Sequence, residues 1–160
     1  MLHLIPAPLH IAGLRMAHAV RLRWWRIVRP RVRGCRVLVL DAEERVLLIR
    51  HSYGSGEWML PGGGLARREE PIMGALRELG EETGCTLDPA LPLGRIDEPA
   101  SFYETHLVVG WTSDAPRADR REILEAAFFA LEALPERTAR VLAAHLPDWV
   151  TAAKAARPPR

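Results

Sequence analysis

Three glutamates in the middle of the chain stand where one face of a helix can bring their carboxylates together. Glu78, Glu81 and Glu82 are three and four residues apart, the spacing at which side chains meet on a helix. Two carboxylates ~5 Å apart repel each other by roughly 3 kcal/mol at an effective dielectric constant near 20. A hard divalent cation that prefers oxygen ligands, such as Mg²⁺ or Mn²⁺, reverses this repulsion. The spacing therefore predicts a metal site.

The surrounding sequence predicts a helix over about residues 71–83 that carries these glutamates. Pro71 suits a first helical turn, and Gly84 suits a left-handed residue at the carboxyl end. The face opposite the glutamates is an apolar stripe at helical spacing, made by Ile72, Ala75, Leu76 and Leu79. Ahead of this helix, residues 58–64 form a short apolar run that ends in three glycines. Such a backbone can approach a phosphate or offer a carbonyl group to a metal.

Together these residues resemble the signature of the Nudix family. The signature is a glycine, five residues, a glutamate, seven residues, and then Arg-Glu-apolar-any-Glu-Glu-any-Gly-apolar. Residues 63–85 fill every position, with Gly63, Glu69, Arg77, Glu78, Leu79, Glu81, Glu82, Gly84 and Cys85. Cys85 stands where an aliphatic residue is usual, and a buried free cysteine behaves as a small hydrophobe. The resemblance extends over about residues 34–146.

The resemblance implies an α/β fold, an α/β/α sandwich with a mixed β-sheet. It also implies a pyrophosphohydrolase that cleaves a phosphoanhydride bond in a nucleoside diphosphate linked to another moiety, as in nucleotide or nucleotide-sugar substrates. The cofactor would be Mg²⁺, with Mn²⁺ as a substitute, and a water molecule activated by the metal would attack phosphorus. The metal would be held by Glu78, Glu81 and Glu82, with the carbonyl group of Gly62 as a further ligand.

Other positions of the signature imply supporting roles. Arg77 would pair with the carboxylates and orient them, and Gly63, Glu69 and Gly84 would shape the loop and the helix. A separate acidic residue late in the chain completes the site, for which Glu122 is the first candidate and Glu125 the alternative. The general base is open between Glu78 and Glu122.

The substrate is not identified by these residues, and the candidates for binding it are Arg50, Tyr53, Arg68 and Tyr103. Two other functions remain open on the same fold. One is a catalytically silent ligand-binding or regulatory module, since a fold does not fix a function. The other is a diphosphate isomerase, which would require a cysteine placed for proton transfer.

Length and composition predict one catalytic domain with two extensions. The 160 residues allow a core in residues 34–150, an Arg- and Trp-rich helical extension in residues 1–33, and a disordered tail in residues 151–160. A net charge of +2 is too small to indicate nucleic-acid binding, and no run reaches the length of a membrane span. The two distant cysteines form no disulfide framework, which favours the cytoplasm. The small-molecule phosphoanhydride substrate is what the resemblance implies.

The extension is predicted to contain an amphipathic helix within residues 15–36. We expect this helix to pack on the catalytic domain or in a homodimer contact, with binding to a membrane surface or to phosphate groups as the alternatives. One of its arginines could also reach the anionic substrate. Strands are expected at residues 35–40, 46–50, 107–112 and 128–131, and a closing helix is expected at residues 137–146.

Overall fold

A single mixed β-sheet forms the centre of the protein. The computed structural model describes residues 7–28, 32–96 and 103–159. Within these residues the strand order is β3-β2-β1-β5-β4, and β6 pairs with the other edge of β2. The strands are β1 (Val32–Leu40), β2 (Val46–His51), β3 (Trp58–Met59), β4 (Ala90–Ile96), β5 (Tyr103–Trp111) and β6 (Ile123–Phe129). The helices are α1 (Ala7–Val28), α2 (Pro71–Thr83) and α3 (Arg140–Ala156), with a short 3₁₀ turn at Leu131–Ala133.

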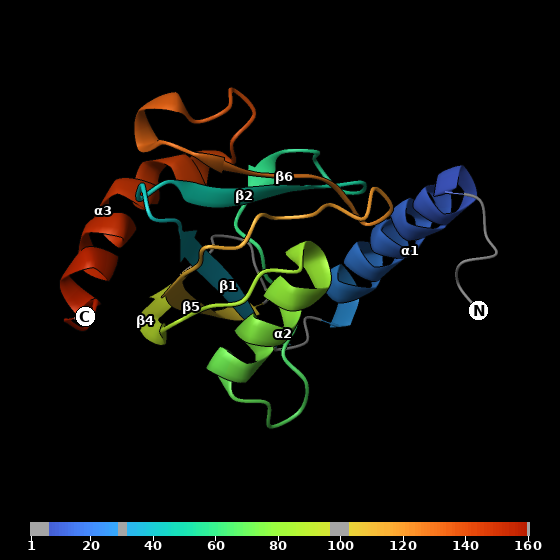
Figure 1. Ribbon diagram of the computed structural model, residues 1–160. Helices are drawn as coiled ribbons and strands as arrows, with labels where there is room; N and C mark the ends of the chain where they lie inside the picture. Colours follow the sequence, from blue (N-terminus) through green and yellow to red (C-terminus); the bar gives the residue numbers. More distant parts are fainter. Residues whose placement is uncertain (1–6, 29–31, 97–102, 160) are drawn as a thin grey trace.

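Helices cover both faces of the sheet (Figure 1). Successive residues of a strand point to opposite faces. Accordingly, Val37 and Val39 of β1 pack with Leu79 of α2 in one cluster, whereas Leu38 and Leu40 pack with the α3 residues of another. Burial on both faces explains why β1 and β2 are almost continuously apolar. The predicted α/β/α sandwich with a mixed sheet is confirmed, because β1 is parallel to β5 and antiparallel to β2.

The glycine loop after β3 runs along the edge of β1 that β2 leaves uncovered. Strand β1 pairs with β2 where Leu40 stands opposite Val46. Nearer the start of β1, the amides of Cys35 and Val37 donate to the carbonyls of Gly63 and Pro61, both at 2.9 Å. Backbone hydrogen bonds therefore fix the loop against the centre of the sheet.

The strand predictions are confirmed for β1, β2 and β5, with shifts at the ends. The fourth expected strand, at residues 128–131, overlaps only the end of β6, which begins at Ile123. Strands β3 and β4 were not predicted. Strand β4 contains Pro92 and Gly94 with a register shift between them, features that are typical of a loop and that only an edge strand tolerates.

The helices of both terminal segments have other bounds than the sequence predicted, and residues 32–36, expected to be helical, belong to β1. Helix α1 begins at Ala7, eight residues before the expected helix, because proline is tolerated in a first helical turn and Pro8 lies there. Helix α3 continues to Ala156 rather than ending near residue 146, so residues 151–156 are not a disordered tail. The fully buried Ala153 packs in the core at that end. In the part of the chain that is described, no helix is long and apolar enough to cross a membrane.

Candidate active site

Helix α2 presents the acidic residues of the Nudix-like signature and begins and ends where the sequence predicts. Pro71 opens the helix, and Gly84 closes it at a φ of 71°, where its amide donates to the carbonyl of Gly80. Ala75 and Leu79 are fully buried against the sheet. The burial of this face turns the glutamates toward the glycine loop and the segment before β6.

Arg77 ties the loop to the helix. Its Nε and Nη2 donate to the two carboxylate oxygens of Glu69 at 3.0 and 3.1 Å, and Nη2 also donates to the carbonyl of Gly64 at 3.1 Å. Nη1 donates to Glu78 at 2.9 Å and reaches Glu81 at 3.4 Å. These charge-assisted bonds, with a contribution from the amide of Ala66, lower the pKa of Glu69 to about 2. The structure thus brings Arg77 and Glu69 together, as the resemblance implies.

The glycines of the loop permit very close approach. A Cβ atom on Gly63 would lie 2.6 Å from the carboxylate carbon of Glu78, and one on Gly62 would lie 2.2 Å from the carbonyl oxygen of Cys35. Gly62 also has a φ of 138°, which side chains rarely adopt. The two positions therefore require glycine for different reasons, one to admit a carboxylate and the other to admit the backbone of β1.

Glu82 is held deepest in the site. Its side chain is only 9% exposed and accepts a hydrogen bond from the amide of Gly62 at 2.9 Å. Its other carboxylate oxygen, Oε1, lies 3.6 Å from Nε2 of His51 on β2. The carbonyl of Gly62 accepts from Nη1 of Arg36 at 3.3 Å. Arg36 contacts this site but was not inferred from the sequence, because it comes from a strand distant from the signature.

Burial raises the pKa values of the carboxyl groups of Glu78 and Glu82. Desolvation first, and then the nearby charges of Glu78 and Glu122, raise the pKa of Glu82 to about 8, although the hydrogen bond from the amide of Gly62 opposes the shift. The pKa of Glu78 is also raised, first by burial and then by Glu81 and Glu122, although Arg77 opposes the shift. A cation bound between these two carboxyl groups would favour their ionised forms and so offset the cost of burying them.

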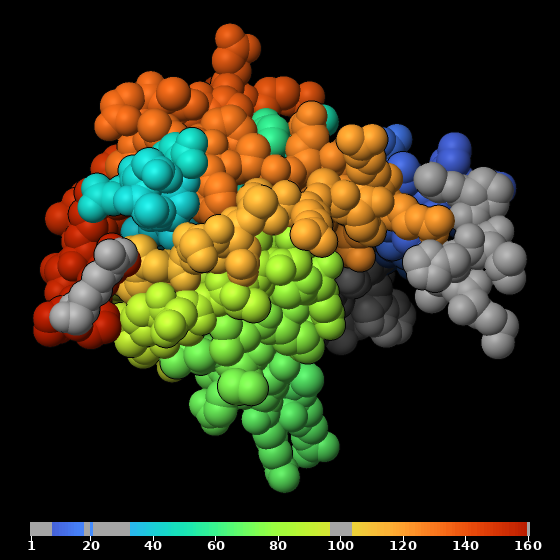
Figure 2. Space-filling view, viewed as in Figure 1, coloured from blue at the N-terminus to red at the C-terminus, as the bar shows by residue number. Residues whose placement is uncertain are grey.

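The segment between β5 and β6 brings in the late acidic residue. It crosses next to the carboxyl end of α2, where the amide of Arg117 donates to the carbonyl of Thr83 (Figure 2). Glu122 follows, and its Oε1 accepts from the hydroxyl group of Tyr53 at 3.1 Å. Glu125 instead pairs with Arg50 at 2.6 Å across the β2–β6 ladder. Of the two candidates, Glu122 is the one whose charge acts on Glu78 and Glu82.

Of the predicted substrate-binding residues, only some lie at the same cavity. Arg50 and Tyr53 line a cavity of about 670 Å³ beside the acidic cluster. Arg68 is exposed in the loop before α2 and is not among the residues that line this cavity. Tyr103 begins β5, and its side chain lies outside the described residues. Arg15, from the arginine-rich segment, and Arg137 also line the cavity.

The acidic cluster fits a hard divalent cation in its chemistry. The described residues include no group of three acidic, histidine or cysteine side chains already arranged around a metal position. The reason is visible in the contacts, since Arg77 holds Glu78 and Glu81 while the amide of Gly62 holds Glu82. All the donors are nevertheless oxygens, and the buried pair lacks full charge compensation. Oxygen donors of this kind are the ligands that Mg²⁺ and Mn²⁺ prefer.

Comparison with known proteins decides the family. The profile of the NUDIX domain matches residues 30–150, about three quarters of the chain. The chain belongs to the Nudix family. Among curated relatives, this Nudix protein is 40% identical over 76 residues to diphosphoinositol polyphosphate phosphohydrolase 2 of Homo sapiens, a region that is 48% of this chain and 42% of the relative. It is 34% identical over 103 residues to a nucleoside triphosphate pyrophosphatase/Nudix hydrolase fusion protein of Bifidobacterium longum, which covers 61% of this chain and 21% of the relative.

Solved structures share the Nudix fold. A MutT NUDIX hydrolase from Burkholderia pseudomallei is 25% identical with a TM-score of 0.65, over 72% of this chain and 95% of that one. A UDP-X diphosphatase is 22% identical with a TM-score of 0.67, over 80% and 65% of the two chains. The Nudix chain spans less than half the length of the diphosphoinositol relatives, so their activity is that of longer proteins.

Proposed function

We propose that this Nudix protein is a Mg²⁺-dependent pyrophosphohydrolase. Its substrate is a small molecule in which a nucleoside diphosphate is linked to another moiety, and water attacks one phosphorus of the diphosphate. The observation that supports this most strongly is the pair of buried carboxyl groups of Glu78 and Glu82, which the glycine loop holds next to each other.

Oxygen ligands for the cation would come from Glu78, Glu81, Glu82 and the carbonyl of Gly62. Mg²⁺, or Mn²⁺ in its place, would supply positive charge against the phosphate oxygens and would lower the pKa of water. Arg77 positions Glu78 and Glu81 from one side, and Glu69 fixes the guanidinium. These contacts hold the ligand set before any cation binds.

Glu122 is the general base in this proposal. The hydroxyl of Tyr53 donates a hydrogen bond to Oε1 of Glu122 and so orients the carboxylate. The other oxygen, Oε2, would accept a proton from the attacking water. The exposed position of Glu122 keeps it open to water, whereas Glu78 already accepts from Arg77. Tyr53 acts through Glu122 and is a positioning residue.

The experiment is a substrate panel with Mg²⁺ and measurement of phosphate release. The panel contains nucleoside triphosphates, ADP-ribose, dinucleoside polyphosphates and sugar nucleotides, together with the diphosphoinositol polyphosphates named for the relatives. Glu122→Gln should lower kcat by about 10²-fold or more, as expected for loss of a general base. Glu125→Gln is the matched control, since it removes the same charge three residues away, and should leave kcat within about threefold. Equal losses in both variants would remove Glu122 from the mechanism, and no turnover of any compound would contradict the proposed function.

The isomerase alternative receives no support from the cysteines. Cys35 and Cys85 are both free and buried among apolar residues, and burial raises the pKa of each thiol. Neither is placed to exchange a proton with a substrate. We further propose a cytoplasmic location, where such thiols stay reduced. A homodimer contact through residues 1–33 remains a proposal, because the side chains of Trp24 and Trp25 lie outside the described residues.

A further inference from the structure

The cavity beside the acidic cluster is lined by three arginines from three distant parts of the chain. Arg15 comes from α1, Arg50 from β2 and Arg137 from the segment before α3. The wall between them is the turn of residues 52–56, in which Gly54 and Gly56 have φ values of 77° and 67°. Among the described residues that line this cavity, none is acidic. The lining is therefore suited to an anion.

Two of the three arginines have no carboxylate partner among the described residues. Arg50 is paired with the carboxylate of Glu125. By contrast, Nε of Arg15 donates to the carbonyl of Ser52 at 2.9 Å, and Nη2 of Arg137 donates to the carbonyl of Ser55 at 2.9 Å. A carbonyl is neutral, and the described residues give neither guanidinium a carboxylate partner within 4.0 Å. These contacts fix the two arginines on the turn while leaving their positive charge to a ligand.

Two residues that line the cavity also contact the acidic cluster. His51 lines it and approaches Glu82, and Tyr53 lines it and donates to Glu122. A diphosphate bound at the acidic cluster would therefore extend its remaining part toward Arg15 and Arg137.

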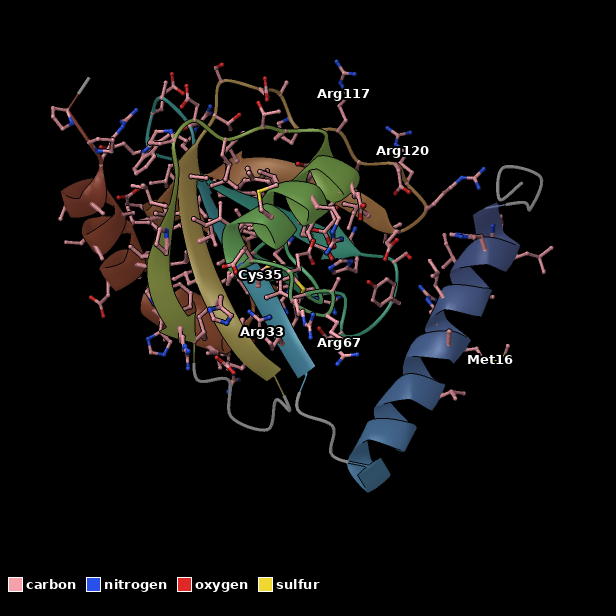
Figure 3. The ribbon with its side chains drawn as sticks, turned by 90° about the horizontal axis from the view of Figure 1, so that it is seen from below. Met16, Arg33, Cys35, Arg67, Arg117 and Arg120 are labelled. Carbon is pink, nitrogen blue, oxygen red and sulfur yellow. The ribbon has the colours of Figure 1, made fainter. Side chains whose placement is uncertain are left out.

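Arg15 lies outside the residues that match the NUDIX domain. Helix α1 lies against one end of that domain, and Met16, the next residue along, points away from it and is 69% exposed (Figure 3). One turn of α1 thus has one residue facing the cavity and the next facing solvent. The helix adds a guanidinium to a cavity that the domain alone would leave open on this side.

We propose that Arg15 is a specificity-determining residue, which together with Arg137 binds a phosphate that the substrate carries beyond the diphosphate to be cleaved. This inference rests on the proposed function, since it assigns the substrate class of the same site to polyphosphorylated molecules. Arg side chains form strong, directional bonds to phosphate oxygens, which makes such a preference large enough to measure.

Binding without turnover tests the inference separately from catalysis. Inorganic tripolyphosphate is titrated into the full-length protein in EDTA by calorimetry, at one fixed salt concentration. Arg15→Gln should raise the Kd about tenfold, equivalent to about 1.4 kcal/mol. Arg117→Gln is the matched control, because it removes the same charge from an exposed residue outside the cavity, and should change the Kd by less than about twofold. Arg137→Gln should act like Arg15→Gln, and it provides a second test if the α1 variant does not fold.

The outcomes separate the inference from the proposed function. Equal Kd values for the wild type and both cavity variants, or equal losses in Arg15→Gln and Arg117→Gln, would overturn the inference. With Mg²⁺ present, Arg15→Gln should lower kcat/KM about tenfold for a compound with additional phosphates and less than about threefold for ADP-ribose. Binding that depends on Arg15 without hydrolysis of any compound would contradict the proposed function and leave the phosphate site in place.

Discussion

Replacing Glu82 by glutamine should stabilise the protein when no cation is present, by an amount that depends on pH. The folded state holds a proton on Glu82 up to a pKa of about 8, whereas the usual value for the side chain is 4.5. Between these two pH values the unfolded chain releases the proton and the folded chain keeps it. Wild-type stability therefore falls as pH rises through this window, and Glu82→Gln removes the loss.

The size of the effect follows from the shift. Each pH unit between the two pKa values is worth about 1.36 kcal/mol. At pH 7, ionisation of Glu82 stabilises the unfolded state relative to the folded state by up to about 3 kcal/mol. At pH 5 the same stabilisation is less than about 1 kcal/mol. The amide oxygen of glutamine can still accept the bond from Gly62, so the variant should gain most of this difference. For a chain of this length, 3 kcal/mol corresponds to roughly 6 to 12 °C in Tm.

Urea unfolding in EDTA at pH 5 and pH 7 measures this directly. Glu81→Gln serves as the control, since its side chain is 63% exposed and the change should stay within about 0.5 kcal/mol at both pH values. The reasoning is refuted if the difference between Glu82→Gln and the wild type is the same at pH 5 and pH 7. Although Glu82→Gln should be the more stable protein without a cation, it should be the less active one with Mg²⁺. Its turnover should fall by about 10²-fold or more relative to the wild type.

Three further predictions concern the cation, the loop and the first helix. Mg²⁺ at about 100 times its Kd should stabilise the wild type by about 2.7 kcal/mol, and the combined Glu78→Gln, Glu81→Gln, Glu82→Gln protein by almost nothing; equal Tm shifts would place the cation elsewhere. Gly62→Ala should cost about 3 kcal/mol or more in urea unfolding, because its Cβ would lie 2.2 Å from the carbonyl of Cys35, whereas Gly64→Ala, with no heavy atom within 4 Å of its Cβ, should cost about 1 kcal/mol or less. Deleting residues 1–28 should lower solubility or Tm by exposing an apolar face of the domain; a truncated protein with unchanged solubility and Tm, alongside a full-length protein that sediments with anionic liposomes, would favour membrane binding instead.

Local signals in the sequence were sufficient for α2 and its carboxylates. Proline at the start, glycine at the end and an apolar stripe between them all act within one helix, so no distant contact was needed to locate it. Arg77 and Glu69, which pair with each other, are likewise only eight residues apart in the sequence, and both belong to the signature. These features depend on sequence spacing, which a single chain displays.

Residues that reach the site through tertiary contacts could not be found in this way. The choice between Glu122 and Glu125 depends on the register of β6 against β2, where Glu125 stands opposite Arg50. Arg15 contacts a residue 37 positions away, and Arg137 one 82 positions away. Strand β3 is two residues long and has no periodicity that could predict it.

The pairing of the glycine loop with β1 also protects the protein from aggregation. Residues 33–37 of β1 have an edge that would be open to a strand of another molecule if the loop were displaced, and Cys35 and Val37 on that edge are buried and apolar. An uncovered apolar edge is a template for pairing between chains. The segment that shapes the acidic site therefore also closes the sheet, and damage to this loop should appear as insolubility as well as lost turnover.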